Sequence, residues 1–320
     1  MRAEYLKAFE DHEVEALKPL LASHVIAMGG RKLEEGDWTS VYCAAKGIPA
    51  SGWSNLDIDV VHGALGVEHK MLSTGAKRPS DKLGQTLMHP SMTRSIRIPD
   101  TDDETEAMVA VLGQYGELVE ARRQRIEGES RLEADLRLGW LLWQTDLSQF
   151  LYFEERMGIP DPGAYYAQWN EISRRGRRKP SRNLWIFDKD SDRKRYSVTT
   201  SAGAKIQPYF DVPSVDSELV YVFTVEGEEA EGGVRLWLSP ATLAGLQRAA
   251  GDTSTAAASR LITETAAHVD PLDGEARDDV EPASPVTVTY EAYEALTTVF
   301  GGRTGDERLR RLLGEVVVDD

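Results

Sequence analysis

Apolar residues return at helical spacing in the first part of the chain. Over residues 4–22 they recur every three to five positions, which predicts an amphipathic helix. A second, shorter helix is expected over residues 38–46, because Gly47 and Pro49 would end it. Residues 102–135 are strongly charged and also follow a helical pattern. The pattern therefore predicts three helical segments before the apolar runs that follow.

Alternation of polar and apolar residues marks the strands. Residues 56–61 alternate, residues 62–65 read as a turn and residues 66–72 return, so the sequence predicts a β-hairpin. The apolar runs at 136–143 and 150–153 fit either strands or the end of a helix. Further strand-like runs, separated by turn residues, cover residues 184–187, 195–200, 219–225 and 234–238.

The order of these elements predicts an α/β fold (α+β), with helices flanking a central mixed β-sheet and a β-rich C-terminal region. We divide the chain into a core at 1–165, a basic segment with a β-rich region at 166–250, an acidic flexible linker at 251–285, and a short strand–helix segment at 286–320. The linker is inferred from its composition, which includes two basic and eight acidic residues. We find no internal repeat.

Composition narrows the class of protein. The 320 residues include 37 Lys and Arg against 53 Asp and Glu, a net charge of −16. Bulk charge would therefore not hold the chain on nucleic acid, although a local basic cleft is compatible with an acidic body. The single cysteine, Cys43, excludes an intramolecular disulfide and a multi-cysteine zinc site. Without a long apolar stretch or an apolar leader, we expect a cytoplasmic protein with no membrane partner.

Candidate chemistry is concentrated in the predicted hairpin. Residues two apart on a strand share a face, so Asp57 points with Asp59, and Glu68 with Lys70. If the chain reverses at Gly63-Ala64, Asp59 lies opposite Glu68 and all four side chains emerge on one side. Ile58, Val60 and Val67 are then expected on the other, apolar side, as is His69.

Clustered carboxylates are suited to Mg²⁺, which prefers oxygen ligands and keeps several waters. Such an ion can acidify a bound water and neutralise charge on a phosphoryl group. An adjacent ammonium, here Lys70, could orient the attacking water or stabilise charge that develops in the transition state. The alternative is that the four groups form a solvated face with cross-strand ion pairs. Aspartate is, however, depleted in strands, so two of them between apolar residues favour the functional interpretation.

An aspartate, a short hairpin and then Glu-x-Lys within Gly66-Val-Glu-His-Lys70 resembles the PD-(D/E)xK nuclease superfamily, which includes most type II restriction endonucleases. The resemblance covers the core at 1–165. It implies that Asp59 or Asp57, together with Glu68, binds the metal and that Lys70 is the catalytic lysine. Many members add a glutamate from the preceding helix. Glu35 or Glu34 could supply it here, with Glu10 and Glu13 as further candidates.

The resemblance also implies an activity and partners. The expected activity is Mg²⁺-dependent hydrolysis of phosphodiester bonds in double-stranded DNA at a specific sequence. A homodimer is expected, because cutting both strands usually requires two active sites. A cognate methyltransferase could be encoded separately.

Basic residues that could contact DNA cluster after the core. Residues 171–210 contain eleven Lys or Arg against four Asp or Glu, a local excess that phosphate backbones attract. A second basic stretch follows Lys70. From these two stretches we select as candidate DNA contacts Arg174, Arg175, Arg177, Arg178, Lys179, Arg182, Lys205, Lys77, Arg78 and Arg94.

Two alternatives to a restriction enzyme remain open. The first is a repair or phage-defence nuclease with little sequence preference, which would cleave without giving discrete fragments. The second is a non-catalytic DNA-binding module on a nuclease-like scaffold. In that case, loss of Glu68 or Lys70 would leave the biological activity intact, while loss of the arginine cluster would abolish it.

Overall fold

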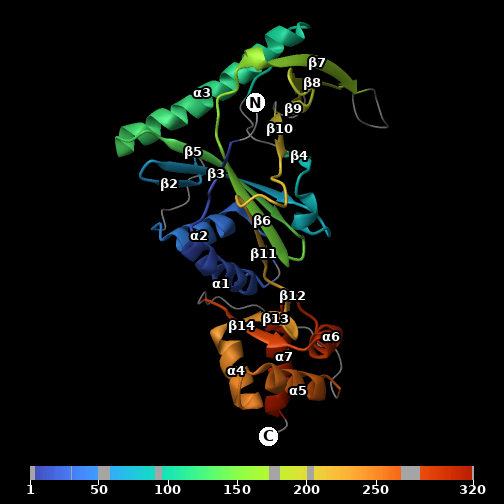
Figure 1. Cartoon of the computed structure of the whole chain (residues 1–320). Helices are drawn as coiled ribbons and strands as arrows, with labels where there is room; N and C mark the ends of the chain where they lie inside the picture. The colour runs from blue at the N-terminus through green and yellow to red at the C-terminus, as the bar shows by residue number, and fades with distance from the viewer. Residues whose placement is uncertain are drawn as a thin grey trace.

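The computed structural model describes residues 4–29, 31–49, 58–90, 96–172, 181–199, 205–267 and 282–318 (Figure 1). In these residues the chain is mixed α/β, with one mixed sheet and two antiparallel sheets. This confirms the predicted class at the level of a helix-flanked mixed sheet.

A mixed sheet forms the centre of the molecule. Its strand order is β1-β6-β5-β3-β2, and β11 pairs with the same edge of β6 as β1 does, at the preceding residues of β6. Only β3 and β5 run parallel, while the other neighbours are antiparallel. The two apolar runs whose type was left open are therefore strands. The strands of this sheet are β1 (Tyr5–Leu6), β2 (Val60–His62), β3 (Leu65–Ser73), β5 (Asp135–Trp143), β6 (Gln149–Arg156) and β11 (Val220–Thr224).

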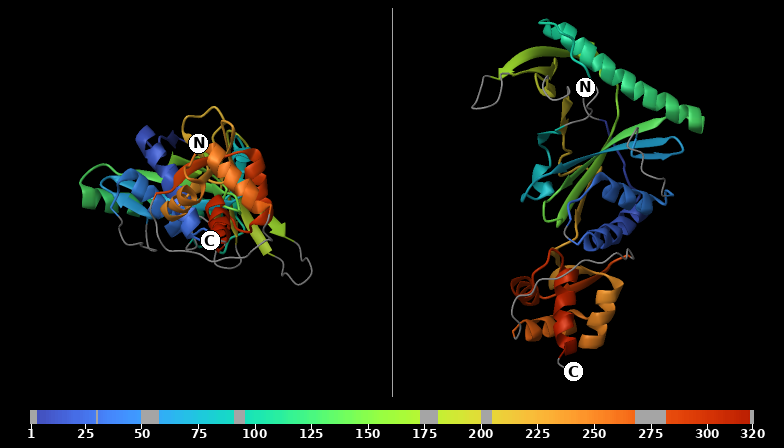
Figure 2. Two further views of the ribbon diagram at one scale, coloured as in Figure 1. Left: turned by 90° about the horizontal axis from the view of Figure 1, so that it is seen from below. Right: turned by 180° about the vertical axis from the view of Figure 1, so that it is seen from behind.

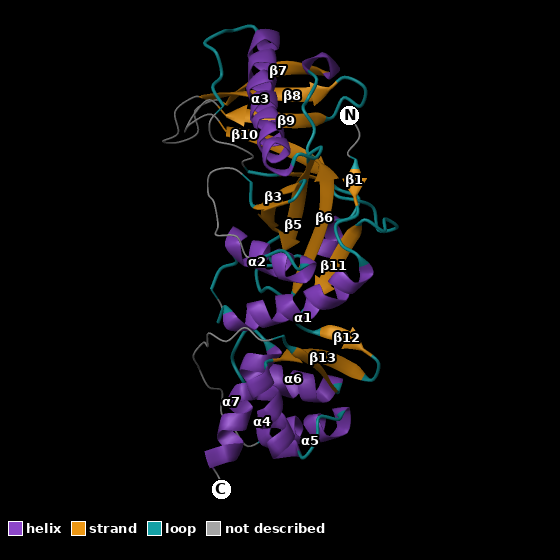
Figure 3. Ribbon diagram, turned by 90° about the vertical axis from the view of Figure 1, so that its left-hand side faces the viewer, coloured by secondary structure: helices purple, strands orange, loops and turns teal. Residues whose placement is uncertain are grey.

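Two helices, α1 (Asp11–Ala27) and α2 (Glu35–Lys46), cover one face of this sheet (Figure 3). Helix α1 begins later than the apolar pattern predicts. Tyr5 and Leu6 pair with β6 as a short strand, and Glu10 then caps the helix. Trp38 and Tyr42 of α2 are fully buried against the sheet, and their packing fixes the position of α2.

A second, antiparallel sheet has the order β4-β10-β9-β8-β7. The long helix α3 (Glu104–Ser130) packs on β7 and β8 and also reaches the central sheet, where Ile126 contacts Gly66 of β3 (Figures 1 and 3). One apolar cluster joins α3 to both sheets. The strands are β4 (Thr86–Met88), β7 (Tyr165–Ile172), β8 (Ser181–Asp188), β9 (Lys194–Thr199) and β10 (Lys205–Asp211), with 3₁₀ turns η1 (Pro79–Lys82) and η2 (Pro162–Ala164).

In its described residues, the C-terminal part forms a three-stranded sheet with four helices, at the opposite end of the molecule from α3 (Figure 2). The predicted flexible linker is wrong over Thr255–Ala266, which form helix α5. Its Ala258 and Ile262 are fully buried, and composition alone did not reveal this apolar face. The other elements are β12 (Glu228–Ala230), β13 (Gly233–Leu238), β14 (Ser284–Val288), α4 (Pro240–Ala250), α6 (Tyr290–Val299) and α7 (Gly305–Val318).

This C-terminal part contains an internal repeat, so the prediction of no repeat is wrong. The unit β13-α4-α5 is followed by β14-α6-α7 at an offset of 50 residues. Ser239 and Thr289 cap the first helix of each unit, and Leu246 and Leu296 are the buried residues at equivalent positions. The two strands pair antiparallel, with Leu236 opposite Val286, its own equivalent in the second unit. The two units are thus related by an approximate twofold axis through this pair.

No helix among the described residues is long and apolar enough to cross a membrane.

Candidate functional site

The predicted hairpin has the expected register. Val60 pairs with Val67 and His62 with Leu65, so the chain reverses at Gly63-Ala64. Asp59 directly precedes β2, and its Oδ2 accepts a hydrogen bond from the backbone N–H of His69 at 2.6 Å. This bond holds the Asp59 carboxylate beside the segment of β3 that carries Glu68 and Lys70.

One apolar residue of the hairpin lies on the other side from the predicted one. Val60 and Val67 belong to the core beneath α1 and α2, as expected. Ile58 instead belongs to the cluster around α3, near Ile126 and Gly66. Strand pairing begins only at Val60, so the alternation assumed for residues 56–61 does not extend back to Ile58.

Glu68 and Lys70 lie together on the face of β3 that is turned toward α3. Both are nearly buried, with exposed fractions of 9% and 8%. Lys70 Nζ donates to Glu68 Oε1 at 2.6 Å, and Arg122 Nη2 of α3 lies 3.3 Å from Glu68 Oε2. Two cations therefore neutralise Glu68 in this arrangement.

Asp59 is electrostatically part of the same group. Burial and the negative charge of Glu68 raise the pKa of Asp59 to about 6, against the opposing effects of the His69 N–H and the Lys70 ammonium. A smaller contribution in the same direction comes from the charge of Glu35. A carboxyl group that resists ionisation beside a second carboxylate would be stabilised in its charged form by a divalent cation.

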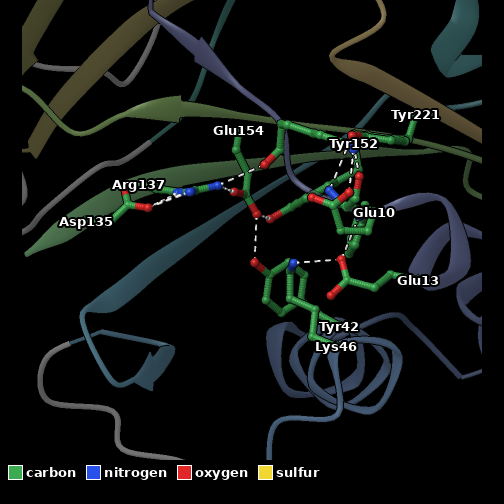
Figure 4. A network of polar contacts seen from close by, with 11 residues as sticks. Glu10, Glu13, Tyr42, Lys46, Asp135, Arg137, Tyr152, Glu154 and Tyr221 are labelled. Carbon is green, nitrogen blue, oxygen red and sulfur yellow. Dashed lines mark hydrogen bonds and ion pairs between the residues drawn. The ribbon is translucent and has the colours of Figure 1, made fainter.

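Glu35 is the candidate from the preceding helix that the fold brings toward Asp59. It is the first residue of α2 and is exposed. Glu34 is the N-cap of α2, where its side chain bonds the helix backbone. Glu13 pairs with Lys46 at the other end of α2, and Glu10 caps α1 (Figure 4). Of the four candidates, Glu35 is the one whose charge contributes to the raised pKa of Asp59.

A buried polar layer supports the site from behind. His69 points away from Glu68 and Lys70, as predicted, and its Nδ1 lies 3.2 Å from Thr39 Oγ1 of α2. On β6, Glu154 accepts hydrogen bonds from Tyr42 and Tyr152, each at 2.9 Å, and pairs with Arg137 at 2.9 Å (Figure 4). These bonds tie α2 to the sheet and so fix the helix that carries Glu35.

The metal-binding capacity rests on few ligands. No group of three or more His, Cys, Asp or Glu side chains in the described part of the chain is arranged to hold a metal. Asp57 lies outside the described residues. Asp59 and Glu68 remain as two coupled carboxylates. Mg²⁺ typically takes one or two protein carboxylates and fills its other positions with water and substrate oxygens, so this pair fits that ion.

The four predicted DNA contacts that the structure describes do not gather with Asp59, Glu68 and Lys70. Arg182 of β8 stacks on Trp169 at 4.1 Å and pairs with Asp102, and Lys205 begins β10 on the second sheet. Arg78 and Lys77 are exposed beyond the end of β3, where Arg78 lines a hollow shared with several glutamates. The remaining candidates, Arg94, Arg174, Arg175, Arg177, Arg178 and Lys179, lie outside the described residues.

Arg122 was not among the predicted site residues. It lies 54 positions beyond Glu68, in a helix whose surface is rich in charged residues, so no local pattern distinguishes it. Its proximity to Glu68 depends on α3 packing across the central sheet, which is a tertiary feature.

Comparison of the chain with models of known protein families, with curated proteins and with solved structures finds no match.

Proposed function

We propose that this protein is a Mg²⁺-dependent DNA endonuclease that hydrolyses phosphodiester bonds, with a core like that of restriction endonucleases. The supporting observation is the coupling of Asp59, Glu68 and Lys70 on neighbouring segments of one hairpin, where burial raises the pKa of Asp59 to about 6. Such perturbed carboxylates beside a lysine are typical of functional sites.

Each residue has a distinct proposed role. Bound Mg²⁺ would supply an acidified water and neutralise charge on the scissile phosphate. Asp59 and Glu68 would hold the ion, which requires Glu68 to exchange at least one of its two cations for it. Lys70, released from Glu68, would then donate to the attacking water or to a phosphate oxygen. Arg122 would keep Glu68 in position from α3.

The proposal extends to the substrate and the assembly. The expected substrate is duplex DNA cleaved at a specific sequence in the cytoplasm, by a homodimer, with a separate cognate methyltransferase protecting the host. The basic residues between β7 and β8 would contribute phosphate contacts outside the described residues.

One observation favours a non-catalytic module instead. Glu68 already has two cationic partners at 2.6 Å and 3.3 Å, as in a structural ion-pair network. In that case the wild-type protein would bind DNA without cleaving it, whether Mg²⁺ or EDTA is present.

The test is cleavage of plasmid and phage DNA with Mg²⁺ or EDTA. We expect Mg²⁺-dependent cleavage by the wild type, and a loss of about 100-fold or more in rate for Glu68→Gln and for Lys70→Met. DNA binding measured in EDTA should remain. Matched controls are Glu133→Gln and Lys32→Met, which change exposed side chains of the same types.

Three outcomes separate the candidates. Discrete fragments would support a restriction enzyme, whereas continuous degradation would support a nuclease of low specificity. Full activity of Glu68→Gln would exclude the proposed site altogether.

A further inference from the structure

A cavity of about 250 Å³ lies between the two large sheets, on the same side of the central sheet as Glu68. Aromatic side chains form much of its wall, and three carboxyl groups also line it: Glu155, and Glu4 and Asp211, which pair with Arg156 and Arg195. The lining includes Tyr115, Trp140, Glu155, Tyr165, Tyr196 and Phe210. This volume is below that of a typical drug-sized site and suits a single small planar ring system.

The strand register relates this cavity to the proposed active site. Glu68 of β3 pairs with Leu138 of β5, and Leu138 pairs with Glu155 of β6, so the three residues form one row across the sheet. Two strand spacings place the Cα atoms of Glu68 and Glu155 about 10 Å apart. Tyr115 of α3 lies near both, because burial and, to a smaller extent, the charges of both carboxylates raise the pKa of its hydroxyl.

The walls of the cavity are suited to a flat ligand. Trp140 and Phe210 stack with ring centroids 3.8 Å apart, and Tyr165 and Tyr196 meet edge to face at 5.9 Å. These rings are held by both sheets, so the wall is formed before a ligand arrives. Aromatic surfaces of this kind bind bases that have left a stack.

Glu155 is the polar group that would form hydrogen bonds with such a ligand. Its Oε1 accepts from the Trp140 indole N–H at 2.8 Å, which fixes the carboxyl group within the cavity. Burial raises the pKa of Glu155 to about 7. A neutral carboxyl group offers one donor and one acceptor side by side. That pair matches a ring nitrogen next to an exocyclic amino group, as in cytosine and adenine.

We propose that this cavity binds a nucleobase that carries an exocyclic amino group, cytosine or adenine, through a hydrogen bond from that amino group to Glu155. The choice of a nucleobase over other planar amines rests on the proposed function. At a rise of about 3.4 Å per nucleotide, the site lies within about three nucleotides of the scissile phosphate. An extrahelical base next to the cleavage position would thus couple recognition to catalysis.

The experiment measures binding of free mononucleotides to the full-length protein by saturation-transfer NMR. A mononucleotide contains no phosphodiester bond, so the result does not depend on cleavage. We expect dCMP and dAMP to bind at least about five-fold more tightly than dUMP, which lacks the amino group. Glu155→Leu should remove this preference, and Glu155→Gln, which keeps an acceptor for the indole, should retain it. Glu229→Gln, which changes an exposed side chain of β12, is the control.

Equal binding of dCMP and dUMP, tighter binding of dUMP, or binding of none of the three would overturn the proposal. The loss of an acceptor for Trp140 could unfold Glu155→Leu, but the comparison of nucleotides on the wild type does not require that variant. Cleavage of plasmid by the same preparation separates the two proposals. Cleavage without a preference for dCMP or dAMP would reject only the base site. A preference without cleavage would reject the nuclease.

Discussion

At the scale of single residues, Asp59 shows why the site is unlike an ordinary surface ion pair. Its carboxylate is held by the His69 N–H, yet burial and Glu68 still raise its pKa to about 6. The folded state therefore binds the Asp59 proton more tightly than the unfolded chain does. The stability that follows from this is present at low pH and is lost as the pH rises to about 6. Above that pH, the ionised Asp59 opposes folding.

Replacing this charge should stabilise the protein while abolishing its activity. Asn at position 59 keeps an oxygen acceptor for His69 and carries no charge. We expect Asp59→Asn to raise the free energy of unfolding by about 1–2 kcal/mol at pH 8, after discounting for partial exposure, with no gain at pH 4. Urea unfolding at the two pH values measures this, and Mg²⁺ should stabilise the wild type but not the variant. A destabilised variant at pH 8 would show that Asp59 is a structural partner of Lys70.

At the scale of secondary structure elements, the link between α2 and the central sheet is polar as well as apolar. Glu154 is completely buried, and its carboxylate is shared by Tyr42 of α2, Tyr152 of β6 and Arg137 of β5. Burial raises the pKa of Glu154, and Arg137 acts against this by stabilising the charged form. Gly139 leaves space for the Tyr152 hydroxyl and for His69, so the layer behind the site could not accept a side chain there.

Removing the cation from this network should strongly destabilise the folded protein. Arg137→Met leaves Glu154 buried without a compensating charge, and we expect a loss of about 3–5 kcal/mol in the free energy of unfolding. The matched control is Arg156→Met, whose side chain is 47% exposed and pairs with Glu4 at the surface. That change should cost less than about 1 kcal/mol. Urea denaturation of the two variants tests the comparison, and similar losses in both would contradict a buried role for Arg137.

The local elements could be predicted because their signals are local. The hairpin register followed from Gly63-Ala64 and the alternation around Val60 and Val67, and this placed Glu68 and Lys70 on one face. Arg122 and the aromatic cavity could not be predicted, since they depend on where α3 and the second sheet pack. The repeat was missed because its two copies share burial and helix caps at an offset of 50 residues but few identical residues.

At the scale of the whole molecule, the C-terminal repeat docks onto the central body through α1. Lys18 pairs with Glu228 and lies over Trp237, which is buried in the same cluster as α1 and α2. The proposed site and the base cavity lie on the other side of the central sheet, near α3. Docking of the repeat therefore leaves the α3 side of the sheet uncovered by the C-terminal part.

Cutting a duplex with this architecture should require two chains. The described part of one chain contains one group of coupled carboxylates with a lysine, at Asp59, Glu68 and Lys70. The two strands of a duplex run in opposite directions, so a symmetric dimer would present one such group to each strand. Wild-type protein should then convert supercoiled plasmid directly to the linear form. Addition of a ten-fold excess of Glu68→Gln should form mixed dimers that cut one strand, and nicked circles should accumulate on a gel.

An excess of Glu133→Gln, which keeps the site, should leave the linear product unchanged. If the mutant excess only slows the appearance of linear DNA and no nicked circles form, then each chain acts alone and the dimer is not the cleaving unit.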